Sequence, residues 1–360
     1  MEMIKVTKHI GYIDALKGLA AIMVFMGHFM LAFPLLQNLK EIPVIKEFVN
    51  GLFPVHTFIL LAGFSLCCSL QNKDPQRSIA TLVAKRYFRF VVPLVIPTLL
   101  AFVLCNCGWG SNQQWGEVIQ SDWMKQFLPP SASFKDLFRS LFYAPVMITP
   151  LINPLWMLKY IFIGTFLAVP FYIGTREIRK RWVKYGLILM FMLLLSKVTI
   201  FYTSMLAGVL TYYIYQENVK LSYMGLLCLV AFCGLTFLSF GNIDSVRAFL
   251  FVVGFTLFPK SQAILTNKVC LWLGSISFEI YLLHSLVICS LGCYMALTME
   301  NAFLSVCCIL VSCIIVVFAC SYMLSKADLW LNTYMVRTID KLLKIHDTDE
   351  SFGNSADACI

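Results

Sequence analysis

Charged residues are scarce in this sequence. Only 13% of its 360 residues are Asp, Glu, Lys or Arg, whereas 59% are hydrophobic. A soluble globular domain carries charge at about 25% of its positions, so this composition excludes an ordinary soluble fold. The long apolar runs instead predict an all-α integral membrane protein, because a helix satisfies its own backbone hydrogen bonds in lipid.

The sequence also lacks the usual signatures of metal sites. None of its 14 cysteines forms a C-x-x-C pair and no Cys/His spacing fits zinc, so we expect no metal. Most cysteines lie in apolar runs, where they act as small hydrophobic side chains. No internal repeat or low-complexity linker divides the chain. We therefore predict one transmembrane domain over residues 1–326 and a cytoplasmic tail over 327–360, its end disordered.

Ten apolar segments are candidate membrane spans. They cover residues 11–33, 52–70, 87–106, 154–174, 184–199, 201–216, 221–240, 245–259, 271–297 and 302–325. Lys and Arg gather in alternate loops, and the positive-inside rule then predicts that both termini are cytoplasmic. This asymmetry accounts for the net charge of +9, so membrane lipids are expected partners and nucleic acid is not.

The longest predicted loop, residues 108–153, faces outward in this topology. It carries Trp109, Trp115 and Trp123, and the pattern over residues 134–143 predicts an amphipathic helix on the membrane surface. Tryptophans in such loops most often anchor at the membrane interface. A long ordered loop can also cover an outward-facing site. Both interpretations stay open.

The first predicted span contains Asp14, Lys17 and His28. Ionisable groups are costly in a bilayer and are therefore usually functional. Lys17 and His28 are eleven residues apart, which places them on one helix face at a separation of roughly 16 Å. Asp14 precedes Lys17 by three residues and can pair with it. The alternative is a polar stripe that holds helices together.

A second histidine, His284, lies in the ninth predicted span. Counting residues from the ends of the two spans places it at a depth similar to that of His28. Ser277, Tyr281 and His284 share a helix face through i, i+4, i+7 spacing. Two histidines at one depth on different helices can meet in a common cavity. For His284, packing or orientation of a neighbour competes with direct chemistry.

Three basic residues mark the predicted cytoplasmic end of the third span. They are Lys85, Arg86 and Arg89, of which Arg86 and Arg89 share a helix face. The planar, permanently charged guanidinium group suits phosphate recognition. Ordinary positive-inside anchoring is the competing explanation.

Five short segments form an ordered pattern along the chain. They are DALKGLAA at 14–21 followed by His28, FPVHTFILLAGF at 53–64, KRYFRFVVP at 85–93, PLWML at 154–158 and LGSISFEIYLLH at 273–284. In this order they resemble the membrane-bound acyltransferase family 3 over most of the chain. Some positions depart from the family pattern. Ala15 replaces Gly, Lys17 replaces the more usual Arg, Ala62 replaces Ser, and Phe278 replaces Tyr.

The resemblance implies a membrane O-acyltransferase. Family members move an acyl group, often acetyl, from cytoplasmic acyl-CoA to a hydroxyl of a glycan or lipid-linked sugar. On this reading His28 is the general base, because an imidazole titrates near neutral pH. The further catalytic candidates are Lys17, Asp14 and His284. The donor-binding candidates are Arg86, Arg89 and Lys85, and the substrate-binding candidates are Tyr281, Ser277 and Trp156. His56, which begins the second predicted span near the outer face, could contact the acceptor, but a solvated interface histidine is favoured. Family grounds favour a bacterial inner membrane.

Two other functions remain open at this point. A transporter or flippase would also bury ionisable residues. Such proteins usually contain an internal repeat, which this sequence lacks. A structural subunit of a polysaccharide export complex would need no contact with CoA. The sequence leaves the acceptor, the length of the acyl chain and the oligomeric state undetermined.

Overall fold

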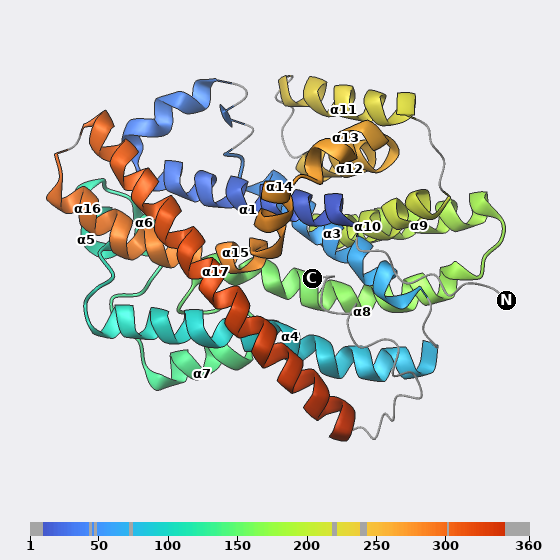
Figure 1. Cartoon of the computed structure of the whole chain (residues 1–360), viewed down its shortest axis with the longest axis horizontal. Helices are drawn as coiled ribbons and strands as arrows, with labels where there is room; N and C mark the ends of the chain where they lie inside the picture. Colours follow the sequence, from blue (N-terminus) through green and yellow to red (C-terminus); the bar gives the residue numbers. More distant parts are fainter. Residues whose placement is uncertain are drawn as a thin grey trace.

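A computed structural model describes residues 10–42, 45–46, 49–71, 75–217, 222–237, 243–300 and 302–342. Within these ranges the chain forms helices and no strand, which confirms the predicted all-α class (Figure 1). The first half comprises α1 (Gly11–Ala32), η1 (Pro34–Glu41), α3 (Leu52–Leu70), α4 (Pro75–Asn106), α5 (Asn112–Val118), α6 (Asp122–Lys125), α7 (Phe134–Phe142), η2 (Asn153–Trp156) and α8 (Met157–Arg176). The second half comprises α9 (Arg181–Ser196), α10 (Ile200–Gln216), α11 (Ser222–Phe237), α12 (Asp244–Leu257), α13 (Pro259–Leu265), α14 (Lys268–Ser275), α15 (Ser277–Val287), η3 (Ile288–Gly292), α16 (Cys293–Thr298) and α17 (Phe303–Leu342).

Six helical segments are long and apolar enough to cross a membrane. They are Gly11–Ala32, Leu52–Leu70, Lys85–Asn106, Asn153–Arg176, Ser277–Thr298 and Phe303–Met335. The pair α12 and α13, whose axes turn by 99°, makes a possible seventh. This finding fits a multi-pass membrane protein. It does not confirm ten spans or the cytoplasmic termini.

The remaining predicted spans form helices that are short for a bilayer. Helices α9, α10 and α11 have 16, 17 and 16 residues. About 20 residues are needed to cross a typical hydrocarbon core. Near the end of the chain, α17 continues through residue 326 to Leu342. The rest of the predicted tail lies outside the described residues. So do Lys5 and Lys8, the basic residues before the first predicted span on which the predicted orientation depends.

Helix α1 lies inside the bundle, against α3, α14 and α15. Helix α3 packs in turn on α8, α10 and α12, while α17 crosses α15 and α4 on the opposite side, as Figure 1 shows. The short helices α5 and α6 lie together at one end of the molecule. This arrangement places α1 and α15 side by side, which positions the site described below.

Two pairs of glycines allow close helix crossings. A Cβ atom on Gly208 of α10 would collide with the backbone of α3 at Leu60 and Gly63. A Cβ on Gly18 of α1 would lie 2.7 Å from the backbone nitrogen of Gly274 in α14. Small residues at such crossings let membrane helices approach closely, because packing is the main force between them in lipid.

Candidate functional site

Helices α1 and α15 bring the two candidate histidines together. His28 Nδ1 lies 3.0 Å from His284 Nε2. The ring centroids are 4.9 Å apart and the ring planes differ by 28°. His284 is fully buried and His28 is half-buried. The two residues are 256 positions apart in the sequence, so this contact depends on the tertiary fold.

Backbone carbonyls define which ring nitrogens carry protons. His284 Nδ1 is 2.8 Å from the carbonyl oxygen of Tyr281 and 3.2 Å from that of Ile280. A carbonyl oxygen only accepts, so His284 Nδ1 must donate, and Nε2 of the neutral ring is an acceptor. His28 Nδ1 must then donate to His284. In a neutral His28 the lone pair therefore resides on Nε2, where it can accept a proton.

Two aromatic side chains from the loop after α5 pack against the His28 ring. Trp123 of α6 stacks on it with centroids 5.9 Å apart and an interplanar angle of 16°. Phe127 meets it edge-on at 5.4 Å and 84°. Trp123 and Phe127 also contact each other, with centroids 4.4 Å apart. The His28 ring is thus enclosed by His284, Trp123 and Phe127.

The other tryptophans of this loop differ in environment. Trp115 is buried, and its Nε1 donates to the carbonyl oxygen of Ala32 at 2.8 Å. Interface anchoring is therefore wrong for Trp115, whereas Trp123 is half-buried and packs on His28. Trp109 is 64% exposed, as an interface anchor would be. The predicted amphipathic helix forms as α7, with Phe134, Phe138 and Phe142 exposed along one face.

Asp14 and Lys17 form a buried ion pair in the first half of α1. Lys17 Nζ lies 3.1 Å from Asp14 Oδ1, and their side chains are only 6% and 14% exposed. The helical rise places this pair roughly 16 Å from His28 along α1. The structure thus separates two of the catalytic candidates, Lys17 and Asp14, from the histidine pair.

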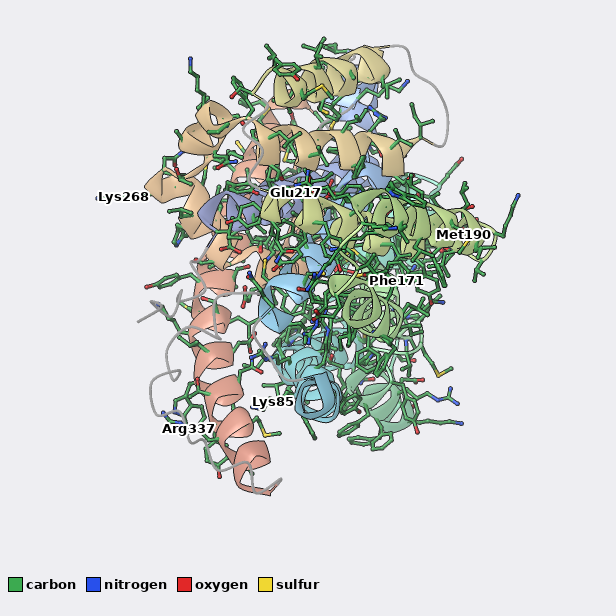
Figure 2. The ribbon with its side chains drawn as sticks, turned by 90° about the vertical axis from the view of Figure 1, so that its right-hand side faces the viewer. Lys85, Phe171, Met190, Glu217, Lys268 and Arg337 are labelled. Carbon is green, nitrogen blue, oxygen red and sulfur yellow. The ribbon has the colours of Figure 1, made fainter. Side chains whose placement is uncertain are left out.

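The basic cluster lies on α4, and Figure 2 shows Lys85 on this helix below Glu217 and Phe171. All three basic side chains are half-buried. The Arg86 guanidinium carbon is 5.6 Å from the centre of the Phe90 ring. Arg86 Nε is buried and has no hydrogen-bond partner among the described residues. A buried guanidinium nitrogen without an acceptor is costly and is therefore suited to an incoming anion.

The substrate candidates contribute mainly to internal packing. Tyr281 is buried and its hydroxyl donates to the carbonyl oxygen of Pro154, just before Trp156. The Ser277 hydroxyl donates to the carbonyl oxygen of Gly274 at 2.8 Å. Trp156 is half-buried and contacts the rings of Tyr160 and Phe201. Tyr281 thereby ties the His284 helix to the segment that enters α8.

His56 has a different environment from the one expected of it. The sequence suggests a solvated histidine at the start of the second span, but His56 is only 4% exposed. Its Nδ1 lies 2.8 Å from the Ser204 hydroxyl, and its ring stacks on Phe201. The solvated interpretation is wrong because α10 packs closely over α3 at this point.

Sequence reasoning missed Asp328, which forms a pair of buried carboxyl groups with Glu279 between α15 and α17. Glu279 is 8% exposed and Asp328 is 4% exposed. Asp328 is close enough for its charge to act on Glu279. Both carboxyl oxygens of Asp328 are buried without a hydrogen-bond partner in the described part of the chain. Asp328 follows a long apolar run, and that position is the signal that could have identified it.

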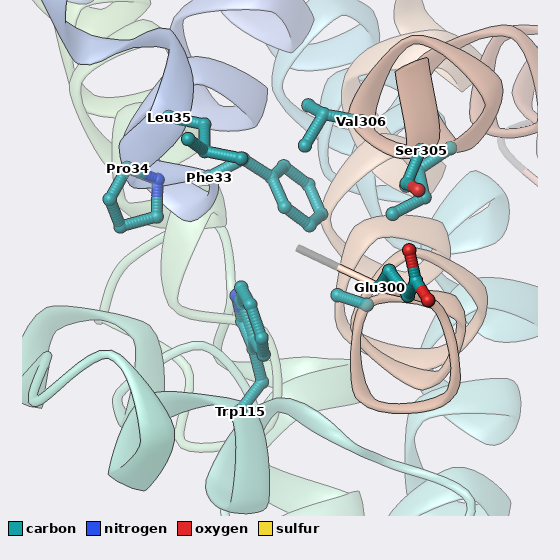
Figure 3. Close-up of a pocket in the computed structure, with 9 residues that line it drawn as sticks. Phe33, Pro34, Leu35, Trp115, Glu300, Ser305 and Val306 are labelled. Atoms are coloured by element: carbon teal, nitrogen blue, oxygen red, sulfur yellow. The ribbon is translucent and has the colours of Figure 1, made fainter. Parts of the chain in front are cut away.

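A small pocket opens at the end of α1, away from the histidine pair. Figure 3 shows Phe33, Trp115 and Glu300 around it, with α17 contributing Ser305 and Val306. Its lining includes neither histidine. Across the described ranges, no group of three or more His, Cys, Asp or Glu side chains is arranged to hold a metal ion.

Comparison with known proteins gives one match. A family model described as an acyltransferase domain, of acyltransferase family 3, matches residues 10–322. The matched range includes the histidine pair, the aromatic residues around it and the basic cluster on α4, but not Asp328. No curated protein and no solved structure matches the chain.

Proposed function

The chain belongs to acyltransferase family 3 and is an acyltransferase, and we propose that it moves an acetyl group from acetyl-CoA to a sugar hydroxyl. The acceptor is a hydroxyl of a glycan or of a lipid-linked glycan. In this proposal the donor enters from the cytoplasm and the acceptor reaches His28 from the opposite side. Family membership does not favour the transporter alternative.

The observation that carries this proposal is the direction of the hydrogen bonds through the histidine pair. They leave the His28 lone pair on Nε2. His28 Nε2 takes the proton of the acceptor hydroxyl while the hydroxyl oxygen attacks the thioester carbonyl carbon. The carbon–sulfur bond then breaks and an ester forms. The CoA sulfur leaves as the thiol with the proton that His28 took from the hydroxyl, which returns His28 to its neutral form. General base catalysis of this type contributes about 10²–10⁴-fold to a rate.

His284 acts through His28 in this mechanism. When His28 gains a proton it becomes a cation, and its Nδ1–H bond to His284 Nε2 stabilises that charge. His284 is itself held by the carbonyl oxygens of Tyr281 and Ile280. We therefore assign His284 as a positioning residue, and Tyr281 as a residue that fixes its helix.

The basic cluster supports the donor half of the proposal. Acyl-CoA carries several phosphate charges, and Arg86 and Arg89 lie on one face of α4 at the start of the candidate span Lys85–Asn106. Arg86 Nε offers a hydrogen-bond donor that no described residue satisfies. In the proposal Lys85, together with the buried Lys17–Asp14 pair, supports the donor end of the site. Ser277 and Trp156 stay substrate-binding candidates in the proposal.

The proposal is tested by measuring the thiol released from acetyl-CoA by the purified protein in lipid nanodiscs, with a panel of glycans. We expect thiol release to rise when a suitable glycan is present and the glycan to gain an O-acetyl group. Replacing Arg86 and Arg89 together by Gln should raise the KM for acetyl-CoA more than it changes kcat. Transport of a glycan without any thiol release would refute the assignment.

The membrane in which the protein lies is also part of the proposal. Six candidate spans fit a multi-pass membrane protein. The positive-inside pattern predicts that the basic cluster on α4 faces the cytoplasm, where acyl-CoA is available. We propose the bacterial inner membrane as the location, with the acceptor assembled on its outer side.

A further inference from the structure

The loop that covers His28 is fastened to both histidine helices. We call residues 111–128 the cap. The Ser111 backbone N–H donates to the carbonyl oxygen of Cys289 at 2.9 Å, five residues beyond His284. Trp115 Nε1 donates to the carbonyl oxygen of Ala32 at 2.8 Å, four residues beyond His28. The position of the cap is therefore set relative to the two histidines.

The cap is also held together from within. The buried Asn112 side chain donates to the carbonyl oxygens of Met124 and Leu128, at 3.2 and 3.0 Å. Gln113 Nε2 donates to the carbonyl oxygens of Lys125 and Leu128, at 2.8 and 2.6 Å. These bonds close the segment that carries Trp123 and Phe127. Its apolar side chains turn inward, since Met124, Phe127 and Leu128 are all buried.

A histidine base beside a thioester activates water as readily as a sugar hydroxyl. Water is present at far higher concentration than any glycan. If it attacked the thioester carbonyl, the carbon–sulfur bond would break and give acetic acid and free CoA thiol. A transferase must therefore keep water from its base, and closed active sites prevent such side reactions by excluding water. The apolar rings of Trp123 and Phe127 lie where that exclusion is needed.

We propose that Trp123 and Phe127 form a water-excluding cover over His28 that makes the enzyme a transferase rather than a thioesterase. This inference rests on the proposed function. Trp123 and Phe127 then determine which hydroxyl reacts. The cover excludes water, and only an acceptor that displaces the Trp123 ring from His28 gains access to Nε2. The flat, apolar face of a sugar ring is suited to such a displacement, because it can stack on the indole.

The test measures acetate formation from acetyl-CoA without any acceptor. We expect Trp123→Ala to raise this hydrolysis at least tenfold over the wild type. Asn112→Ala, which loosens the cap without removing a ring, should raise it as well. Trp123→Phe keeps an aromatic cover and should hydrolyse acetyl-CoA more slowly than Trp123→Ala. Trp109→Ala is the matched control, because Trp109 is 64% exposed and lies outside the cap.

The double variant His28→Ala with Trp123→Ala separates the claim that Trp123 excludes water from the claim that His28 is the base. If hydrolysis rises in Trp123→Ala and is lost in the double variant, both the cover and the base are supported. If folded Trp123→Ala and Asn112→Ala both hydrolyse acetyl-CoA at the wild-type rate, the cover is refuted, while glycan-dependent thiol release still tests the proposed function. If the raised hydrolysis persists without His28, His28 as the base is refuted.

Discussion

At the scale of single residues, the account depends on one chain of hydrogen bonds. The Tyr281 carbonyl oxygen accepts from His284, and His284 accepts from His28. His284 needs a hydrogen-bond acceptor at Nε2, because that atom orients His28 and stabilises its charged form. For the orientation of His28, the rest of the His284 ring is less important than this acceptor atom.

We predict that His284→Gln retains more activity than His284→Leu. The Gln side-chain oxygen can accept from His28 Nδ1, whereas Leu offers no acceptor. Misplacing the base costs about 10²-fold, so His284→Leu should lower kcat by roughly that factor, and Gln should recover part of it. The measurement is kcat for glycan-dependent thiol release in variants with matched melting temperatures. Equal loss in both variants would argue against orientation by His284.

Asp328 provides a prediction about stability. Its carboxyl oxygens are buried without partners and lie near Glu279. A buried polar group without a hydrogen bond costs about 1–3 kcal/mol. Asp328→Asn removes the possibility of a second negative charge there, and we expect a higher melting temperature at pH 8. A lower melting temperature would show that the Asp328 carboxyl group has a hydrogen-bond partner when the protein is in the membrane.

Asp136 is the matched control for this substitution. It is exposed, and the Ser133 side chain and backbone N–H bond its carboxylate in the capping box of α7. These bonds hold the pKa of Asp136 below its usual value. The charged form therefore stabilises the folded state, and Asp136→Asn should lower the melting temperature slightly, opposite to Asp328→Asn.

Residue patterns predicted part of the site. The burial of Asp14 and Lys17 and the similar depth of His28 and His284 follow from helical spacing within apolar runs, which is a local property. The packing of Trp123 on His28 and of His56 on Ser204 could not be predicted, because each joins segments far apart in the sequence. The catalytic roles of the candidates stay predictions.

At the scale of elements, the packing of the helices depends on close crossings at glycine residues. The segment around Gly63 resembles a family motif, and the structure shows a physical reason for glycine there. Gly63 faces Met205 and Gly208 where α3 meets α10.

The positions at which helices break were harder to predict from the sequence. The span predicted over 271–297 begins as α14, and a separate helix, α15, follows at Ser277.

We predict that Gly208→Ala destabilises the protein by about 1–3 kcal/mol, because overpacking a tight contact forces backbone shifts. The new Cβ would lie 2.8 Å from the Phe64 nitrogen. Gly174→Ala in α8 is the matched control, since its Cβ would meet nothing within 4 Å. The free energy of unfolding of that control should rise by up to about 1 kcal/mol, because Ala has a higher helix propensity than Gly. Melting temperatures in detergent provide the comparison, and equal behaviour of the two variants would contradict the crossing.

At the scale of the whole molecule, the proposal needs two distinct entrances. The basic cluster and the cap lie at opposite ends of the candidate span Lys85–Asn106, because Asn106 closes α4 just before the cap. Composition and hydropathy predicted an all-helical membrane protein correctly. The number of spans was not determined by the sequence, because α9, α10 and α11 are apolar but short.

The orientation is open to a direct experiment. Cys107 follows α4 on the cap side and is exposed. We predict that a membrane-impermeant maleimide labels it in intact spheroplasts and that Cys107→Ser removes this labelling. Labelling of Cys107 only after the membrane is permeabilised would place the cap in the cytoplasm and reverse the proposed entrances.

The central claim is that His28 is the base that deprotonates the acceptor. The most direct measurement is the rate at which labelled acetyl passes from acetyl-CoA to a glycan, with wild-type protein and with His28→Ala in the same lipid. His56→Asn is the control, because its amide can still bond Ser204. The account predicts a loss of about 10²-fold or more for His28→Ala and little change for the control. A folded His28→Ala protein that transfers acetyl at the wild-type rate would contradict it.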